Sequence, residues 1–211
     1  MATFEVSTPH GPANVHLHPV ERPAAALILG HGAGGGVTAR DLVAATDVAR
    51  AESISVALIE QPYRVAGRRS PAPAHQLDAA WTAVVDRLSS SELHGLPLIV
   101  GGRSSGARVA CRTAAESGAI GVLCLAFPLQ PAGRSGSAPR PSRLAELDAV
   151  AVPTLVVQGS RDPFGIPPSR AGRTVVEIAG DHRLQSDLQA LREAVRRWLA
   201  GVVATGSSAV R

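Results

Sequence analysis

One stretch of the sequence, residues 97–111, constrains the fold of this chain more than any other. It reads PLIVGGRSSGARVAC, so a short apolar run leads into glycines and serines, and small residues that suit a helix follow. The apolar run has the length of a buried strand. Gly102 and Gly106 flank Ser104 two positions away on either side. This spacing predicts a sharp strand-to-helix turn that holds the Ser104 hydroxyl exposed above the start of a helix.

The Gly-x-Ser-x-Gly pattern alone does not decide a function, because 21 of the 211 residues are glycine and such patterns arise by chance. A glycine-rich turn between a strand and a helix is the plain structural alternative. A serine held on such a turn is also how some enzymes present a nucleophile. The choice depends on whether the chain supplies a base, an acid and donors for a negatively charged oxygen.

The composition is that of a single globular domain. Hydrophobic residues make up 45% of the chain and charged residues 18%, and 211 residues are enough for one core. No apolar run approaches the roughly 18 residues of a membrane span, and the N-terminus lacks the features of a signal peptide. We expect one domain over residues 1–205, a flexible tail at 206–211, a cytoplasmic location and no membrane partner.

The charged and metal-binding residue types exclude several classes of function. All 21 basic residues are arginines, they are spread along the chain, and aromatics are only 3%, so we expect no nucleic-acid partner. Cys111 and Cys124 occupy apolar positions and predict buried free thiols. His16 and His18 alternate on one strand, where a polar outer face is the main interpretation and a metal site the alternative. We expect neither a metal nor another cofactor.

Strand and helix patterns alternate along the chain after an N-terminal hairpin. Two short β-like runs at 4–8 and 13–20 form the hairpin, and apolar strand patterns follow at 24–29, 54–59, 98–100, 121–127, 153–158 and 174–179. Helical patterns lie between or after them at 40–51, 74–89, 144–150 and 184–203, together with the helix after Ser104. This order predicts an α/β fold: a mostly parallel twisted sheet with an N-terminal antiparallel hairpin and helices on both faces.

A candidate base and a candidate acid each follow a predicted strand. His182 comes after the run at 174–179, and Asp162 after the run at 153–158. Because the carboxyl ends of parallel strands meet at one edge of a sheet, we expect both to lie near Ser104. Asp181 is the rival acid, but as the neighbour of His182 it is badly placed to reach Nδ1 in line. We therefore predict a catalytic triad of Ser104, Asp162 and His182.

A negatively charged oxygen needs backbone N–H donors, and the sequence offers two. One is Ser105, which follows the nucleophile, and the other is Ala33 in the glycine-rich loop at 30–36. A phosphate-binding loop is the alternative for this segment, but no Lys-Ser/Thr pair follows it. His31 and Gly34 of the same loop are candidate substrate-binding residues.

Several arginines flank the loops expected at this edge. Arg64, Arg68 and Arg103 are candidates for binding a carboxylate or phosphate group of a substrate, because a guanidinium matches the geometry of both. Solvation at the surface is the alternative for each of them.

The segments GHGAGGG, EQPYRVAGRR, GGRSSGARVA, VVQGSRDPFG and GDHRL together resemble the α/β-hydrolase superfamily over roughly residues 4–203. Within it they are similar to a small hydrolase-like family that includes bacterial proteins and the human testis-expressed and NSL-complex hydrolase-like proteins. Dienelactone-hydrolase-like proteins are a more distant resemblance, because Ser104 stands where they carry cysteine. The resemblance implies Ser104 as nucleophile, Asp162 as acid, His182 as base and residues 31–35 as the oxyanion element.

These observations together predict a serine hydrolase that cleaves a carboxylic ester or thioester of a small-molecule acyl substrate through an acyl-enzyme intermediate. A hydrolase-fold binding or scaffold protein with little or no turnover is the alternative. Only a loop and a short helix separate the strands that end near 127 and begin at 153, so we expect an open site without a large lid. The patterns make no prediction about the oligomeric state.

Overall fold

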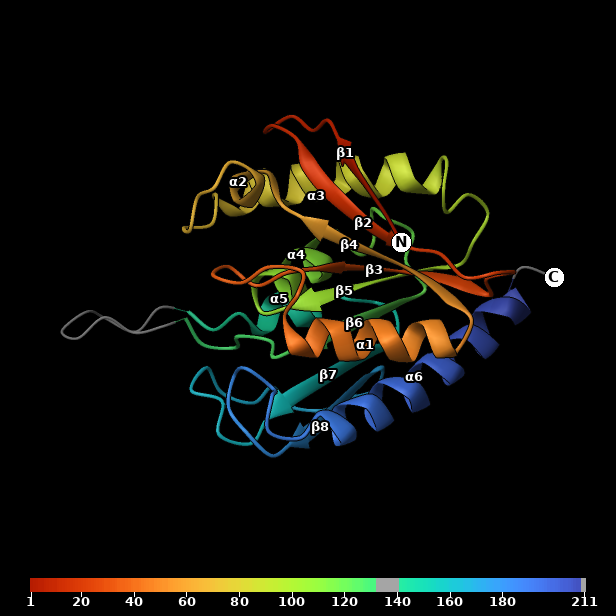
Figure 1. Cartoon of the computed structure of the whole chain (residues 1–211). Helices are drawn as coiled ribbons and strands as arrows, with labels where there is room; N and C mark the ends of the chain where they lie inside the picture. Colours follow the sequence, from red (N-terminus) through yellow and green to blue (C-terminus); the bar gives the residue numbers. More distant parts are fainter. Residues whose placement is uncertain (132–140, 210–211) are drawn as a thin grey trace.

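The computed structural model describes residues 1–131 and 141–209, and an eight-stranded sheet organises them (Figure 1). The strand order is β1-β2-β4-β3-β5-β6-β7-β8. Strands β1 (Ala2–Val6) and β2 (Ala13–His18) form an antiparallel hairpin, and β2 pairs antiparallel with β4 (Ile54–Glu60). All pairs from β4 to β8 are parallel. The predicted mostly parallel sheet with an antiparallel hairpin is confirmed.

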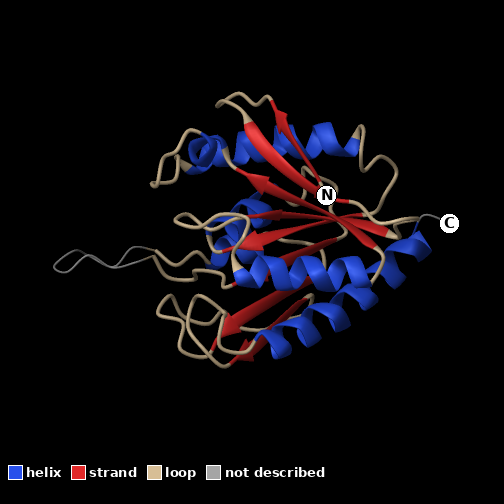
Figure 2. Cartoon of the chain, in the orientation of Figure 1, coloured by secondary structure: helices blue, strands red, loops and turns tan. Residues whose placement is uncertain are grey.

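The parallel strands in the middle of the sheet are apolar along most of their length, because helices cover both of their faces. Every residue of β3 (Ala25–Gly30) and of β7 (Thr154–Gly159) is buried. The remaining strands are β5 (Leu98–Arg103), β6 (Gly121–Leu125) and β8 (Arg173–Ile178). Their arrowheads point to one side in Figure 1, and we call that end of the sheet the carboxyl edge. The strands turn progressively across the sheet (Figure 2), as a right-handed strand twist requires.

Helices cover the two faces of the sheet and create two separate cores. Helices α1 (Arg40–Ala51) and α6 (Leu188–Ala209) pack together on one face. Their core contains Leu42, Val48 and Leu191. The opposite face is covered by α3 (Ala74–Ser89), α4 (Ser105–Thr113) and α5 (Leu144–Asp148). The fully buried Trp81 of α3 is the largest side chain of that second core.

Among the helices, the main differences from the sequence prediction concern α6 and a short additional helix. Helix α6 begins at Leu188 and not at 184, because the Asp187 carboxylate accepts the Ala190 N–H and caps the helix there. The helix continues through Ala209, beyond the expected end at 203, and residues 210 and 211 lie outside the described residues. The flexible tail at 206–211 stays a prediction. A short helix, α2 (Pro62–Val65), stands where we expected only a loop.

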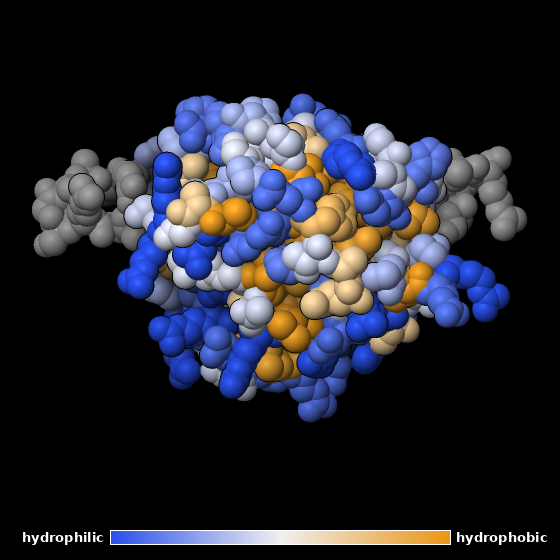
Figure 3. Space-filling view, turned by 45° about the horizontal axis from the view of Figure 1, so that its top comes forward, coloured by the Kyte–Doolittle hydropathy of each residue, from blue (hydrophilic) through white to orange (hydrophobic). Residues whose placement is uncertain are grey.

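Figure 3 shows apolar residues in the middle of one face of the molecule with polar residues around them. Among the large apolar residues of the described chain, only Met1 and Val43 are strongly exposed. Within the same described part, no helix combines the length and apolarity needed to cross a membrane.

The connection between β6 and β7 was expected to lack a large lid. The described part of this connection contains α5 as its one helix, and residues 132–140 of the predicted loop lie outside the described residues. Arg143 ties the loop back to the sheet, since its Nη1 donates to the carbonyl of Pro128 at 2.9 Å. The described parts of the connection therefore carry no helical domain above the carboxyl edge.

Candidate active site

Ser104 lies on a sharp turn between the end of β5 and the start of α4. Its backbone has φ 52° and ψ −107°, in the left-handed region that side chains other than hydrogen disfavour. The Ser104 N–H donates to the carbonyl of Leu125 at 2.9 Å, and its carbonyl accepts from the Arg108 N–H at 3.2 Å. These bonds hold the strained residue between β6 and the first turn of α4. The predicted strand–turn–helix arrangement is present.

The two glycines that flank Ser104 allow a close contact between the turn and the sheet. The structure shows that they make room for Gly30 at the end of the neighbouring strand β3. A methyl group on Gly102 would lie 2.5 Å from the Gly30 carbonyl oxygen, and one on Gly106 would lie 2.5 Å from the Gly30 carbonyl carbon. The glycines therefore let the turn pack directly against β3.

The side chains of Ser104, His182 and Asp162 form a continuous chain of hydrogen bonds. His182 Nε2 lies 2.9 Å from Ser104 Oγ, and His182 Nδ1 lies 2.8 Å from Asp162 Oδ2. An ionised carboxylate only accepts hydrogen bonds, so Nδ1 carries the proton and Nε2 accepts from the serine hydroxyl. The ring of Phe164 packs edge-on against the imidazole at 4.5 Å between centroids. The structure brings these three predicted residues together at the carboxyl edge.

Asp162 is held by contacts that the sequence analysis did not identify. Its Oδ1 accepts the Phe164 N–H at 2.9 Å, and its Oδ2 accepts from Gln158 Nε2 at 2.8 Å. Gln158 is fully buried at the end of β7, and its Nε2 also lies 3.0 Å from the Phe127 carbonyl oxygen. The signal was visible in the sequence as the one polar side chain late in the apolar run TLVVQG.

The loop that carries His182 approaches the sheet closely at one glycine. A methyl group on Gly159, at the end of β7, would lie 2.8 Å from the Gly180 carbonyl oxygen. Only a residue without a side chain lets residues 180–182 cross β7 at this height. The rival acid Asp181 points elsewhere: it is exposed, and its Oδ1 accepts the N–H of Arg183 at 2.9 Å. Asp162, and not Asp181, contacts the imidazole.

His31 also lies at the carboxyl edge, but both of its ring nitrogens contact backbone groups. Nδ1 donates to the Gly32 carbonyl at 2.8 Å, and Nε2 accepts the Gln61 N–H at 3.1 Å. Burial lowers the pKa of this imidazole, which keeps it neutral. His31 therefore fixes the start of the glycine-rich loop, and its nitrogens have no remaining hydrogen-bonding capacity for a substrate.

Of the two expected oxyanion donors, Ser105 directly follows Ser104 in the chain and Ala33 belongs to the glycine-rich loop. Ser105 is the first residue of α4, where backbone N–H groups have no partner within the helix. The glycine-rich loop passes alongside, since a methyl group on Gly32 would lie 3.5 Å from Ser104 Cβ. The hydroxyl of Tyr63 donates to the Ala33 carbonyl at 2.9 Å and holds the loop, while Gly34 is exposed at its tip. The assignment of Ala33 and Ser105 as donors remains a prediction.

A family model described as an alpha/beta hydrolase domain matches residues 23–193, which is most of the chain. The chain belongs to the α/β-hydrolase family. The match spans the glycine-rich loop and the three residues of the hydrogen-bonded chain, so the family and the site geometry concern the same part of the molecule. No curated protein sequence is significantly similar to this hydrolase.

Solved structures support the same fold. A serine hydrolase without lid from Xanthomonas campestris has a TM-score of 0.74 at 19% identity, covering 95% of this chain and 94% of that chain. Est1E from Butyrivibrio proteoclasticus has a TM-score of 0.77 at 16% identity, and the match covers 97% of this chain and 100% of that chain. A dienelactone hydrolase from Anabaena variabilis has a TM-score of 0.75 at 17% identity, and the match covers 95% of this chain and 96% of that chain. At these identities the likeness establishes the α/β-hydrolase fold, and the predicted fold class is confirmed.

Arg103, a candidate substrate-binding residue, contacts other residues of the hydrolase with its guanidinium group. Its Nε lies 2.8 Å from Oδ2 of Asp41 on α1, and its Nη2 donates to the His182 carbonyl at 3.1 Å. The side chain of Arg103 is 15% exposed and that of Asp41 is 1% exposed. We therefore correct the expectation: Arg103 is an internal ion-pair partner and not a free cation for a substrate.

Arg64 and Arg68 lie on the α2 side of the carboxyl edge. Nη1 of Arg64 donates to the carbonyl of Arg68 at 3.2 Å. Arg68 borders a cavity of about 80 Å³ that Tyr63 and Leu77 also line. A smaller cavity of about 10 Å³ adjoins Tyr63, Leu77 and Ser105. Substrate binding by the two arginines remains a prediction, and of the two only Arg68 lines one of these cavities.

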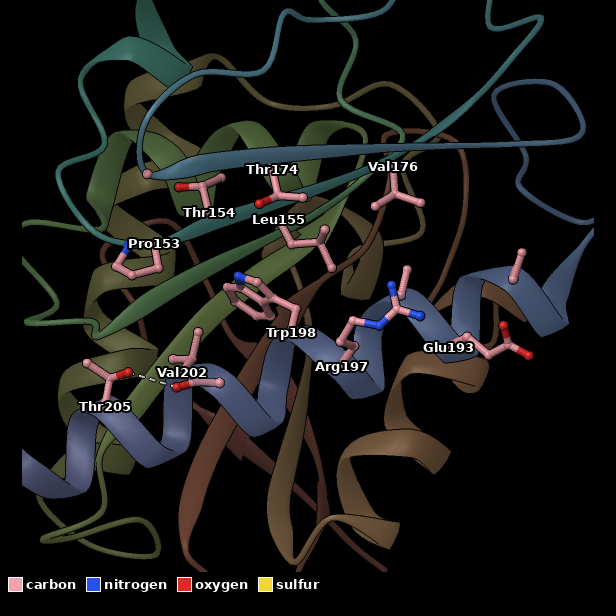
Figure 4. A pocket seen from close by; sticks show the side chains of 14 residues that line it. Pro153, Thr154, Leu155, Thr174, Val176, Glu193, Arg197, Trp198, Val202 and Thr205 are labelled. Carbon is pink, nitrogen blue, oxygen red and sulfur yellow. Dashed lines mark hydrogen bonds between the residues drawn. The ribbon is translucent and has the colours of Figure 1, made fainter.

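A cavity larger than those two lies away from the hydrogen-bonded chain. It has a volume of about 630 Å³ and lies between α6 and the strands β7 and β8, and none of Ser104, Asp162 and His182 lines it. Figure 4 shows Trp198 and Val202 of α6 facing Pro153 and Leu155 of the sheet. Ligands of α/β folds bind at the carboxyl ends of strands. The reactive residues, and not the volume, therefore mark the candidate site.

Proposed function

We propose that this protein is a serine hydrolase that cleaves a carboxylic ester or thioester of a small acyl substrate through an acyl-enzyme intermediate. The observation that carries the proposal is the hydrogen-bonded chain from Ser104 Oγ through His182 to Asp162, with distances of 2.9 and 2.8 Å. A serine hydroxyl is a weak nucleophile until an adjacent base accepts its proton, and this arrangement provides that base.

The reaction follows from the atoms in contact. Ser104 Oγ attacks the acyl carbon while His182 Nε2 takes the hydroxyl proton, and Asp162 stabilises the imidazolium that results. The backbone N–H groups of Ser105 and Ala33 bind the oxygen that becomes negative. His182 then gives its proton to the departing alkoxide or thiolate, which leaves the acyl group on Ser104. A water molecule, activated by the same histidine, releases the acid and restores the serine.

The surroundings of Ser104 favour short acyl groups. The serine is only partly buried, and the cavities beside Ser105 and Tyr63 measure about 10 and 80 Å³. Est1E, which shares the fold, has been solved with ferulic acid bound. We therefore propose a panel of neutral and anionic esters, graded by acyl chain length, with a feruloyl ester as one member.

Ser104→Ala tests the proposal directly. A fluorophosphonate probe is expected to label the wild type and not this variant, and kcat on the best ester is expected to fall by roughly 10⁴-fold or more. Ser117→Ala is the matched control, because the Ser117 hydroxyl only donates to the Ala114 carbonyl beyond the end of α4. Folded wild type that neither reacts with the probe nor cleaves any ester would refute the proposal and favour a binding or scaffold role.

A further inference from the structure

Arg103 occupies a position in β5 where a charged side chain is unexpected. Side chains alternate between the two faces of a strand, so Arg103 faces the same side as Ile99, which packs in the core beneath α1 and α6. A guanidinium at the edge of an apolar core loses hydration and needs compensating contacts. The residue is also the middle position between Gly102 and Ser104, so its backbone is part of the strained turn.

The compensating charge comes from α1. Asp41 lies in the first turn of that helix, which begins at the carboxyl edge (Figure 1). Its Oδ2 lies 2.8 Å from Arg103 Nε, and its Oδ1 accepts the N–H of Leu42 at 2.9 Å. Burial raises the pKa of Asp41, and the neighbouring Arg103 acts in the opposite direction by favouring the carboxylate. Each charge is therefore tolerated because the other is present.

The rest of the guanidinium contacts two segments of the candidate site. Nη2 donates to the His182 carbonyl at 3.1 Å, and Nη1 lies so near Gly32 that a methyl group there would approach it to 2.6 Å. One side chain thus contacts the glycine-rich loop and the histidine loop while its own backbone precedes Ser104. These are the segments whose relative positions set the attack geometry.

We propose that Arg103 and Asp41 are a positioning pair that fixes the His182 loop and the glycine-rich loop relative to Ser104. Asp41 binds Nε and so fixes the orientation of the guanidinium plane. In this orientation Nη2 donates to the His182 carbonyl. Neither residue touches the substrate. The expected change in kcat rests on the proposed acyl transfer. The expected change in the position of the two loops rests on geometry alone.

Arg103→Lys is the main test, because lysine keeps the charge opposite Asp41 but cannot contact both the carboxylate and the His182 carbonyl. We expect kcat on a neutral ester to fall by about 10- to 100-fold with KM changed less than about twofold, since misplacement by about 1 Å costs on the order of 10²-fold. Asp41→Asn should likewise lower kcat with little change in KM, and it replaces Arg103→Lys as the test if the lysine variant does not fold. Unchanged kcat, or a KM increase confined to anionic esters, would overturn the proposal.

The matched control is Arg112→Lys. Arg112 pairs with Asp78 at 2.5 Å and with Glu146 at 3.4 Å in the last turn of α4, at the opposite end of the helix from Ser104. Its loss should lower thermal stability and leave kcat unchanged. A rate loss of similar size in the control would show that weakening any such ion pair is sufficient, which would contradict a positioning role for Arg103.

A second readout does not need turnover. In protein with ¹⁵N-labelled histidine, the Nδ1 proton that His182 shares with Asp162 should give a low-field NMR signal. We expect this signal to broaden and exchange faster with water in Arg103→Lys and to stay sharp in Arg112→Lys. An unaltered signal in Arg103→Lys contradicts the pair's role. If the wild type cleaves no ester, the proposed function fails, and this comparison still decides the positioning role.

Discussion

Two histidines at the same edge of the sheet show how partners, and not location, decide what a side chain does. His31 follows β3 and His182 follows β8, and both lie beside the turn that carries Ser104. His31 contacts two backbone groups, the Gly32 carbonyl and the Gln61 N–H, and is 2% exposed. His182 contacts two side chains, Ser104 and Asp162, and its side chain is 16% exposed.

The difference sets what each imidazole can do with a proton. The backbone groups that contact His31 do not exchange protons with its ring, and burial lowers the pKa of the imidazole. His31 is therefore suited to holding a loop in place. His182 lies between a hydroxyl and a carboxylate, so its ring can take the hydroxyl proton while the carboxylate stabilises the imidazolium that forms. We therefore expect substitution of His182 to affect rate and substitution of His31 to affect stability.

The largest expected effect comes from exchanging each histidine for glutamine. His182→Gln should lower kcat by roughly 10⁴-fold or more, because no general base remains for Ser104. His31→Gln should instead destabilise the fold by about 1–3 kcal/mol, as expected when buried polar groups lose their partners. Ester hydrolysis and urea unfolding on both variants make the comparison. An equal fall in kcat in the two variants, with the His31 variant still folded, would contradict the difference between the two histidines.

A somewhat smaller effect separates the two aspartates near His182. Asp162→Asn should lower kcat by about 10⁴-fold, because an amide can donate to Nδ1 and would then favour the wrong tautomer. Asp181→Asn should leave kcat near that of wild type, since Asp181 contacts the Arg183 N–H and not the imidazole. Steady-state kinetics on the two variants test this. Equal rates for wild type and Asp162→Asn would remove Asp162 from the proposed mechanism.

The smallest expected effect is a pH dependence of stability due to His31. Its pKa in the folded protein lies below the ordinary value of 6.5, so the unfolded chain takes up this proton at higher pH. Stability from this group is therefore complete above about pH 6.5 and is lost as the pH falls below it, by at most about 1.4 kcal/mol per pH unit.

Urea unfolding on either side of that pH tests the effect. His31→Gln should lose less stability on acidification than the wild type. The pKa of His18 is also lowered by burial, but this residue is present in both proteins and cancels in the comparison. Parallel pH profiles for the two proteins would contradict the assigned role of His31.

The sequence predicted the succession of strands and helices along the chain and the neighbourhood of Ser104, because both depend on local patterns. Apolar runs followed by glycine or a polar residue mark buried parallel strands and their carboxyl ends, and Asp162 and His182 could be placed by that rule alone. Helices α1 and α3 begin and end where their periodicity indicated, at Arg40–Ala51 and Ala74–Ser89.

The positioning contacts could not be predicted in the same way. Arg103 and Asp41 lie on a strand and a helix far apart in the chain, and each alone has the pattern of an ordinary surface charge. Arg103 was accordingly assigned to substrate binding. Gln158 was overlooked although a buried amide at the end of an apolar strand is a usable signal. Pairings between distant charged residues depend on how α1 packs against the sheet, which periodicity does not encode.

The backbone of Ser104, at φ 52°, has a consequence for anyone who engineers this chain. A residue with a side chain in this conformation costs on the order of 1–3 kcal/mol, and glycine would avoid most of that cost. A search that ranked substitutions by folding stability alone would thus favour glycine at this position. It would return a more stable protein without the proposed nucleophile, so thermostability screens on this fold need an activity filter at position 104.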